Sequence, residues 1–258
     1  MTSPASKIRP WLHANIESAV HLVLCPFAGA SGSAFSSWHS LTDLYLNVSL
    51  AVYPGRDHRM KEPPATSIEL LAEEVAFEIA EMPREKRELI LLGGHSMGAQ
   101  VAFEACLKLE TRGYPPAAVL LSGCHAPHLT SRRKLSHLSD HAFIEELISI
   151  GGCDPLLQEQ PTLLRPFLPM LRADFAATES YHRDRREDAP KLNTPALLVY
   201  GAQDTEASRE EVSAWSQWID YDYRIYEMAG DHFYITQRPL AFASKVVEFY
   251  FRCFAFAR

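Results

Sequence analysis

One serine lies in a pattern that can make its side chain a nucleophile. The residues Gly94-His95-Ser96-Met97-Gly98 match G-x-S-x-G. The apolar run Leu89–Leu92 leads into this pattern and a helical pattern, Ala99–Leu109, leads out of it, which predicts a strand, a tight turn and a helix. Such a turn strains the serine backbone, and side chains at positions 94 and 98 would collide with neighbouring elements, so both must be glycine. A strand–helix turn with an inert serine is the alternative interpretation.

Two backbone amides are candidates for stabilising the oxyanion that attack by Ser96 would create. Met97 begins the helix, whose N-terminal amides point toward the serine, so Met97 N–H is the first candidate. The second donor is expected in the loop Cys25–Gly32, which follows an early strand and has small residues that let the backbone approach a ligand. Phe27 N–H is the predicted donor and Ala28 the next choice. An ordinary glycine-rich turn is the alternative.

A serine hydroxyl needs a histidine to remove its proton. Of the eleven histidines, only His232 lies beyond the last predicted strand, in the loop Gly230–Phe233. We therefore predict that His232 is the general base. The other histidines near the motifs precede any suitable late strand, and we expect them to line a pocket or to lie on the surface: His95, His125, His128, His137 and His141.

That histidine in turn needs a carboxylate to fix its tautomer and stabilise the imidazolium. The predicted strand Ala196–Gly201 ends just before Asp204, which places a carboxylate on the same rim of the sheet as Ser96. Asp204 is the predicted acid, and a turn-forming aspartate is its alternative. Asp231 is the second choice, but it is adjacent to His232 in sequence and is expected to cap or brace the loop instead.

Short apolar runs alternate with helical patterns along the chain. Predicted strands are His21–Phe27, Val48–Pro54, Glu88–Gly93, Ala117–Gly123, Ala196–Gly201 and Tyr223–Met228. Predicted helices are Thr66–Met82, where Thr66 and Glu69 have capping-box spacing, Met97–Glu110 and Pro239–Phe254. This alternation predicts an α/β fold with a mostly parallel sheet and helices on both faces.

The segment of about 125–190 breaks the alternation. It has amphipathic patterns at Phe143–Ile150 and Leu163–Phe175 but no strand-like run. We expect a helical lid inserted into one domain that spans residues 1–258, because long insertions in such folds often cover sites. Additional packing helices are the alternative. No linker, repeat or low-complexity stretch divides the chain.

Composition restricts the classes of partner and the cellular location. The chain has 258 residues, 47% of them hydrophobic, and a net charge of −7, which disfavours binding to nucleic acid or anionic membranes. It has no signal-peptide core at residues 1–10 and no run long enough to span a bilayer, so we expect a cytoplasmic protein. Two basic clusters, Arg132–Lys134 and Arg183–Arg186, are either solvated surface or a docking site for an acidic partner. The five dispersed cysteines suggest free buried thiols, with neither disulfides nor a zinc site.

Together these residues resemble the stand-alone type II thioesterases of non-ribosomal peptide and polyketide synthesis, which have the α/β-hydrolase fold. The resemblance covers nearly the whole chain. The chain departs from the family pattern at two positions. Ala30 replaces the usual second glycine, and its side chain would narrow the oxyanion loop. Gln203 replaces a second acidic residue that is common in the family. Beyond the serine pattern, the resemblance rests on motifs in the family's order: Pro26–Ser31, similar to P-x-A-G-G-S, Tyr53–Arg56, similar to P-G-R, Leu171–Phe175, Gly201 with Asp204, and Gly230–Phe233.

The resemblance implies hydrolysis of acyl groups from the phosphopantetheine arm of carrier proteins, which clears mis-primed or stalled intermediates. Ser122–His128 and the pattern of the expected lid look closest to members found beside siderophore synthases. The expected partners are acyl or peptidyl carrier protein domains, and the expected state is a monomer that needs no metal or redox cofactor. Arg56 and Arg59 either hold the pantetheine phosphate or the partner surface, or brace a turn through salt bridges.

Two other functions are alternatives to hydrolysis of carrier-bound thioesters. A carboxylesterase or acyltransferase acting on small soluble esters would have the same three side chains. A non-catalytic α/β-hydrolase-like binding module would be expected to lack one of them, whereas the chain has all three residue types.

Overall fold

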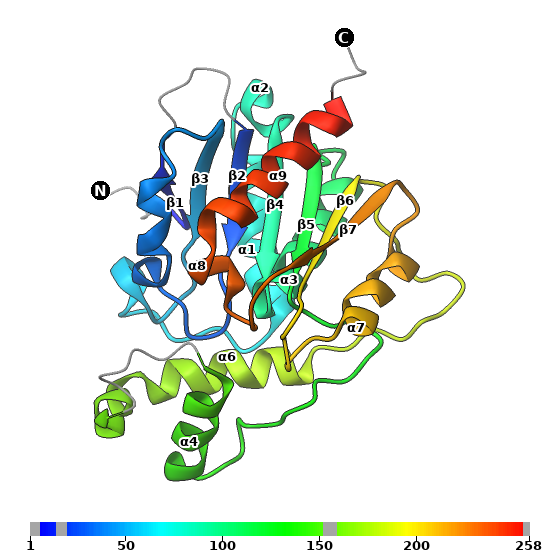
Figure 1. Ribbon diagram of the computed structural model, residues 1–258. Helices are drawn as coiled ribbons and strands as arrows, with labels where there is room; N and C mark the ends of the chain where they lie inside the picture. Colours follow the sequence, from blue (N-terminus) through cyan, green and yellow to red (C-terminus); the bar gives the residue numbers. More distant parts are fainter. Residues whose placement is uncertain (1–5, 14–19, 152–158, 255–258) are drawn as a thin grey trace.

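The computed structural model describes residues 6–13, 20–151 and 159–254. Within this part of the chain, seven strands form one sheet in the order β1-β3-β2-β4-β5-β6-β7 (Figure 1). All neighbouring pairs are parallel except β1 and β3. The strands are β1 (Ile8–Leu12), β2 (Val20–Cys25), β3 (Leu46–Ala51), β4 (Ile90–His95), β5 (Ala118–Ser122), β6 (Ala196–Gly201) and β7 (Tyr223–Met228).

The six predicted strands are confirmed to within a few residues, but β1 was not predicted. Its sequence Ile-Arg-Pro-Trp-Leu has no continuous apolar run, and only its two end residues are buried. Pro10 lacks an N–H group and is tolerated because β1 lies at the edge of the sheet, where its register against β3 shifts between Pro10 and Leu12. An edge strand of this kind gives little hydrophobic signal in the sequence.

Side chains of the central strands alternate between two apolar layers. On β4, Ile90 and Leu92 pack on one face of the sheet and Leu91 packs on the other. The first face is covered by α1 (Ile68–Ala80), α3 (Met97–Thr111), α7 (Arg209–Ser213) and the short helix η4 (Ala214–Trp218). The second is covered by η1 (Gly32–Ser40), α8 (Tyr234–Gln237) and α9 (Pro239–Phe254). The predicted parallel sheet with helices on both faces is therefore confirmed.

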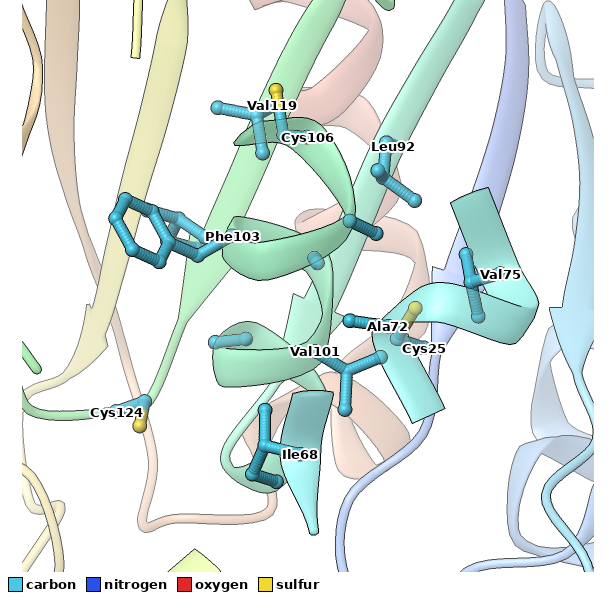
Figure 2. Packing of buried hydrophobic residues seen from close by; sticks show 14 of the residues in the cluster. Cys25, Ile68, Ala72, Val75, Leu92, Val101, Phe103, Cys106, Val119 and Cys124 are labelled. Carbon is cyan, nitrogen blue, oxygen red and sulfur yellow. The ribbon is translucent and has the colours of Figure 1, made fainter. Parts of the chain in front are cut away.

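Helix α3 forms the centre of the first layer. Figure 2 shows that Val101 points toward α1, Cys106 lies beside Val119 of β5, and Phe103 points to the side of α3 away from α1. Val101 and Phe103 are completely buried, and burying an aliphatic or aromatic side chain of this size contributes roughly 1.5–3 kcal/mol. This packing holds α3, and therefore the turn that precedes it, firmly against β4.

The helices on this layer begin and end close to the predicted positions. One detail was wrong: Ser67, not Thr66, caps α1, since its hydroxyl accepts a hydrogen bond from Leu70 N–H at 3.3 Å. Helix α1 begins at Ile68, so Thr66 is one residue too early to act as the cap. Two further short helices are η2 (Asp57–Arg59) and α2 (Arg84–Arg87).

The segment between β5 and β6 contains α4 (Asp140–Ile150), η3 (Pro161–Phe167) and α6 (Leu168–Ser180). The two predicted amphipathic patterns lie on these helices, although the second is split where η3 passes into α6. The helices share a small apolar cluster that includes Phe143, Leu168 and Leu171. Figure 1 shows α4 and α6 lying together across one end of the sheet.

Two expectations from composition can be compared with this structure. Cys25, Cys106 and Cys124 are free and buried, as predicted, whereas Cys253 is partly exposed and Cys153 lies outside the described residues. No helix of the described segments has both the length and the apolar character to cross a bilayer.

Candidate active site

Ser96 lies at the turn between β4 and α3, in a backbone conformation that few residues adopt. Its φ is 54° and its ψ is −124°. The two glycines of the motif permit this turn: a Cβ at Gly94 would lie 1.8 Å from Gly98 O, and a Cβ at Gly98 would lie 2.0 Å from Cys25 O. Ser96 N–H donates to Ser122 O on β5 at 2.8 Å. The structure therefore agrees with the steric argument that glycine is required at positions 94 and 98.

His232 and Asp204 meet at the carboxyl ends of the last two strands. His232 Nδ1 lies 2.9 Å from Asp204 Oδ2 and 3.1 Å from Oδ1. Asp204 Oδ1 also accepts hydrogen bonds from the N–H groups of Glu206 at 2.8 Å and Ala207 at 3.1 Å. Burial alone would raise the pKa of Asp204, but the hydrogen bond and charge of His232 and the two backbone amides outweigh it and lower that pKa. A carboxylate so held stays ionised and takes the proton-bearing Nδ1 of His232 as its partner.

Asp231, the second choice for the acid, bonds to other groups of the same loop and of α8. Its Oδ1 accepts from Phe233 N–H at 2.8 Å, its Oδ2 accepts from the Gln237 side chain at 3.2 Å, and the residue is exposed. It braces the loop, as expected. Gln203 also supports this loop, because its Oε1 accepts from Gly230 N–H at 2.9 Å.

Ser96 and His232 line one pocket, and the helices between β5 and β6 form part of its wall. Phe175, Thr178 and Glu179 of α6 line it opposite the strands. Phe27, the predicted oxyanion donor, and Ala28 also line it. Met97 is the first residue of α3, and the first amides of a helix have no partner within the helix, so its N–H is available to a ligand near Ser96.

The five histidines that were expected to line a pocket or lie on the surface have different environments in the structure. His125 lines the pocket, and His137 and His141 are exposed, as expected. His128 is half-buried and lies with its Nδ1 2.9 Å from Trp218 Nε1, which donates to it. The expectation for His95 was wrong: its side chain is completely buried behind the pocket.

His95 holds the backbone of His232 from behind. Its Nε2 lies 2.8 Å from His232 O, and since a carbonyl can only accept, Nε2 carries the proton. Its Nδ1 then accepts from the Ser122 hydroxyl at 2.9 Å, which lies 2.7 Å from Tyr234 OH. The sequence could not reveal this role, because the partners of His95 lie 27 and 137 residues away.

The buried position of His95 gives a prediction for acid stability. Burial, and then the neighbouring His232, lower the pKa of His95 from 6.5 to about 3. Above pH 6.5, His95 is neutral in both the folded and the unfolded state. Below pH 6.5 it takes up a proton in the unfolded state only, so the free energy of unfolding decreases as the pH decreases, by up to about 1.4 kcal/mol per pH unit. His95→Gln keeps a hydrogen-bond donor but cannot take up this proton. We expect its free energy of unfolding, measured by urea titration, to decrease between pH 7 and pH 5 by about 2 kcal/mol less than that of wild type. Equal losses would contradict the prediction.

The arginines whose roles were left open are paired in the structure. Arg56 and Arg59 are only 5% and 3% exposed, which favours the bracing interpretation over contact with a phosphate. Arg59 bonds to Glu62 and Glu74, and Arg56 bonds to Asp174 at 2.6 Å. In the two basic clusters, three guanidinium groups are paired with glutamates: Arg132 with Glu211, Arg133 with Glu206 and Glu146, and Arg183 with Glu104.

A mostly parallel sheet with a strained serine turn after β4, an aspartate after β6 and a histidine after β7 defines an α/β-hydrolase. Comparison with known proteins narrows this class. The Thioesterase domain family model matches residues 20–252. The chain belongs to this family and is a thioesterase, a hydrolase of thioester bonds.

Individual relatives are similar over most of their length. The probable anguibactin biosynthesis thioesterase AngT of Vibrio anguillarum is 42% identical over 227 residues, which cover 87% of this chain and 89% of AngT. Thioesterase PikA5 of Streptomyces venezuelae is 35% identical over 88% of this chain and 79% of PikA5. Among solved structures, YbtT, a type II thioesterase from the yersiniabactin pathway, has a TM-score of 0.89 and 46% identity over 96% of this chain and 99% of YbtT.

Proposed function

We propose that this thioesterase removes acyl groups from the phosphopantetheine arms of carrier protein domains, using Ser96 as nucleophile, His232 as general base and Asp204 as the acid that orients it. The observation that carries the proposal is the placement of all three side chains at one end of the sheet. There Nδ1 of His232 is occupied by Asp204, which leaves Nε2 for Ser96 in the shared pocket.

In the first half of the reaction, Ser96 Oγ attacks the thioester carbonyl as His232 Nε2 takes its proton. The negative charge that develops on the carbonyl oxygen is stabilised by the N–H groups of Met97 and Phe27. The tetrahedral intermediate then collapses, the C–S bond breaks, and His232 returns the proton to the departing pantetheine thiol. An acyl ester on Ser96 remains.

In the second half, water attacks this ester as His232 takes a proton from it; the acyl C–Oγ bond then breaks, His232 returns the proton to Ser96 Oγ, and the free acid leaves. Side chains, backbone amides and water account for every proton and charge in this cycle, so the mechanism we propose uses no metal or redox cofactor. The helices between β5 and β6 act as a lid in this scheme, because Phe175, Thr178 and Glu179 of α6 form the wall that an acyl group would meet.

The pathway we propose is the assembly of a siderophore by a non-ribosomal peptide or polyketide synthase. Two relatives carry names that refer to anguibactin and yersiniabactin biosynthesis, and both match nearly the full length of this chain. Such an enzyme acts as a monomer that visits successive carrier domains and clears acyl groups that the synthase cannot extend.

Capture of the acyl-enzyme tests the proposal. The protein is mixed with acetyl- and aminoacyl-loaded carrier proteins, quenched in acid within one turnover and digested for mass spectrometry. We expect the acyl mass on the peptide that contains Ser96 and on no other. An acyl group on another residue would contradict the assignment. A higher kcat/KM for a p-nitrophenyl ester than for every loaded carrier protein would instead favour a carboxylesterase.

A further inference from the structure

Helix α6 touches the loop that contains Phe27 through one buried carboxylate. Asp174, only 2% exposed, lies on the side of α6 that faces this loop. Its Oδ2 accepts from Gly29 N–H at 2.8 Å, and its Oδ1 accepts from Arg56 Nη2 at 2.6 Å. Each oxygen of the carboxylate therefore has a different partner, one on the oxyanion loop and one on the turn after β3.

That turn holds the same loop at two more points. Arg56 Nη1 donates to Ala30 O at 3.2 Å, and the hydroxyl of Tyr53 donates to Pro26 O at 3.2 Å. The loop is closed on itself by Ala30 N–H, which donates to Phe27 O at 3.0 Å. Side chains from the turn and from α6 thus fix the residues on both sides of Phe27, which itself lines the pocket.

Close packing of α6 accompanies these hydrogen bonds. Gly29 has a φ of +78°, and a Cβ at this position would lie 2.5 Å from Leu171 Cδ2 on α6. Gly55, with a φ of +85°, would place a Cβ 3.4 Å from Met170 Cγ on the same helix. Consecutive residues of α6 therefore rest against the oxyanion loop and the neighbouring turn, with little room for either to shift.

We propose that Asp174 is a positioning residue that couples α6 to the oxyanion loop, so that the place of Phe27 N–H depends on where this helix sits. The inference rests on the proposed function, because it takes Phe27 N–H as an oxyanion donor. It also accounts for two motifs that the catalytic scheme leaves unused, Tyr53–Arg56 and Leu171–Phe175. Through this contact, movement of the lid helix weakens oxyanion stabilisation without any change in Ser96, His232 or Asp204.

The size of the expected effect follows from the role of an oxyanion donor. Loss of one such donor costs about 10²–10³ in kcat, and a misplacement of about 1 Å can cost about 10². Asp174→Asn cannot present an acceptor to both Arg56 and Gly29, and it leaves the guanidinium without its buried counter-charge. We expect kcat to fall about 10- to 100-fold for an N-acetylcysteamine thioester, with KM changed by less than about threefold.

A pair of uncharged double variants separates positioning from simple loss of a buried charge. In Arg56→Met/Asp174→Asn, the amide oxygen is free to accept from Gly29 N–H; in Arg56→Met/Asp174→Ala, no acceptor remains. Both lack the buried charges, so their thermal stabilities should be similar. Both variants lack the Arg56 bond to Ala30 O, so they are compared with each other: we expect kcat of the second to lie about 10- to 100-fold below that of the first.

Inhibition by a trifluoromethyl ketone provides a second measurement. This compound forms a hemiketal oxyanion with Ser96, so its Ki should rise in parallel with the loss of kcat/KM across the variants. Glu74→Gln is the matched control: it removes a carboxylate from buried Arg59, whose described side-chain bonds go to Glu62, Glu74 and Val52 O and not to the loop, and it should leave kcat and Ki unchanged.

Equal kcat values for the two double variants would overturn the inference. If the variants do not fold, hydrogen exchange in the wild-type protein decides the matter: Gly29 N–H should exchange slowly, and rapid exchange would overturn the inference as well. Either failure would leave the dependence on Ser96 intact, whereas hydrolysis by Ser96→Ala at the wild-type rate would refute the proposed function itself.

Discussion

Ser96→Ala will lower kcat for an acyl-carrier protein by at least about 10³-fold while the protein remains folded. The loss is large because no other group can form the acyl-enzyme, and activity that remains comes from substrate binding and the oxyanion donors. The fold is expected to persist because the backbone strain at φ 54° is the same for serine and alanine, which both carry a Cβ. Hydrolysis is measured by release of the free thiol, and folding by circular dichroism and thermal denaturation.

Ser131→Ala is the matched control for this experiment. Ser131 lines the same pocket as Ser96, and its hydroxyl donates to Arg133 O. We expect this variant to keep kcat within about threefold of wild type. Hydrolysis by Ser96→Ala at the wild-type rate would remove the nucleophile from the mechanism, whatever the control shows.

The fold could be predicted from the sequence wherever a local pattern determines it. The buried strands β2, β4, β5 and β6 each contain an apolar run, because helices cover both faces of the sheet. Strand β1 has no such run, since it lies at the edge and is buried only at its ends. The break between η3 and α6 was also missed, because an apolar pattern continues across it.

In the candidate site, too, some residues could be predicted from local sequence patterns and others could not. Ser96, Asp204 and His232 each follow a strand, so the topology of the sheet brings them to one end although the chain separates them widely. The roles of His95 and Asp174 depend on partners far apart in sequence, such as His232 O and Gly29 N–H. No local pattern shows which carbonyl or amide a buried side chain will meet.

Asp204→Asn will lower kcat by about 10⁴-fold, the loss seen when the acid of a serine triad becomes an amide. The carboxylate of Asp204 accepts from His232 Nδ1–H and so leaves Nε2 unprotonated. An asparagine can donate to Nδ1 instead, which favours the tautomer with the proton on Nε2. That tautomer cannot take the proton from Ser96.

The same substitution changes the response of stability to acid. Because the pKa of Asp204 is lower in the folded state than in the unfolded chain, its contribution is present above the ordinary pKa of an aspartate. The contribution is lost as pH falls through the folded-state pKa. We expect Asp204→Asn to be less stable than wild type near neutral pH and to lose less stability in acid.

Asp231→Asn supplies the matched control, since Asp231 lies next to His232 in the chain but is exposed and bonds to Phe233 N–H. It should keep kcat within about tenfold of wild type, because it only braces the loop. Measured by thiol release from the same carrier protein, a greater loss for Asp231→Asn than for Asp204→Asn would transfer the role of the acid to Asp231. One comparison thus distinguishes the two carboxylates, because in the part of the chain that the structure describes, the carboxylate at Nδ1 of His232 is that of Asp204.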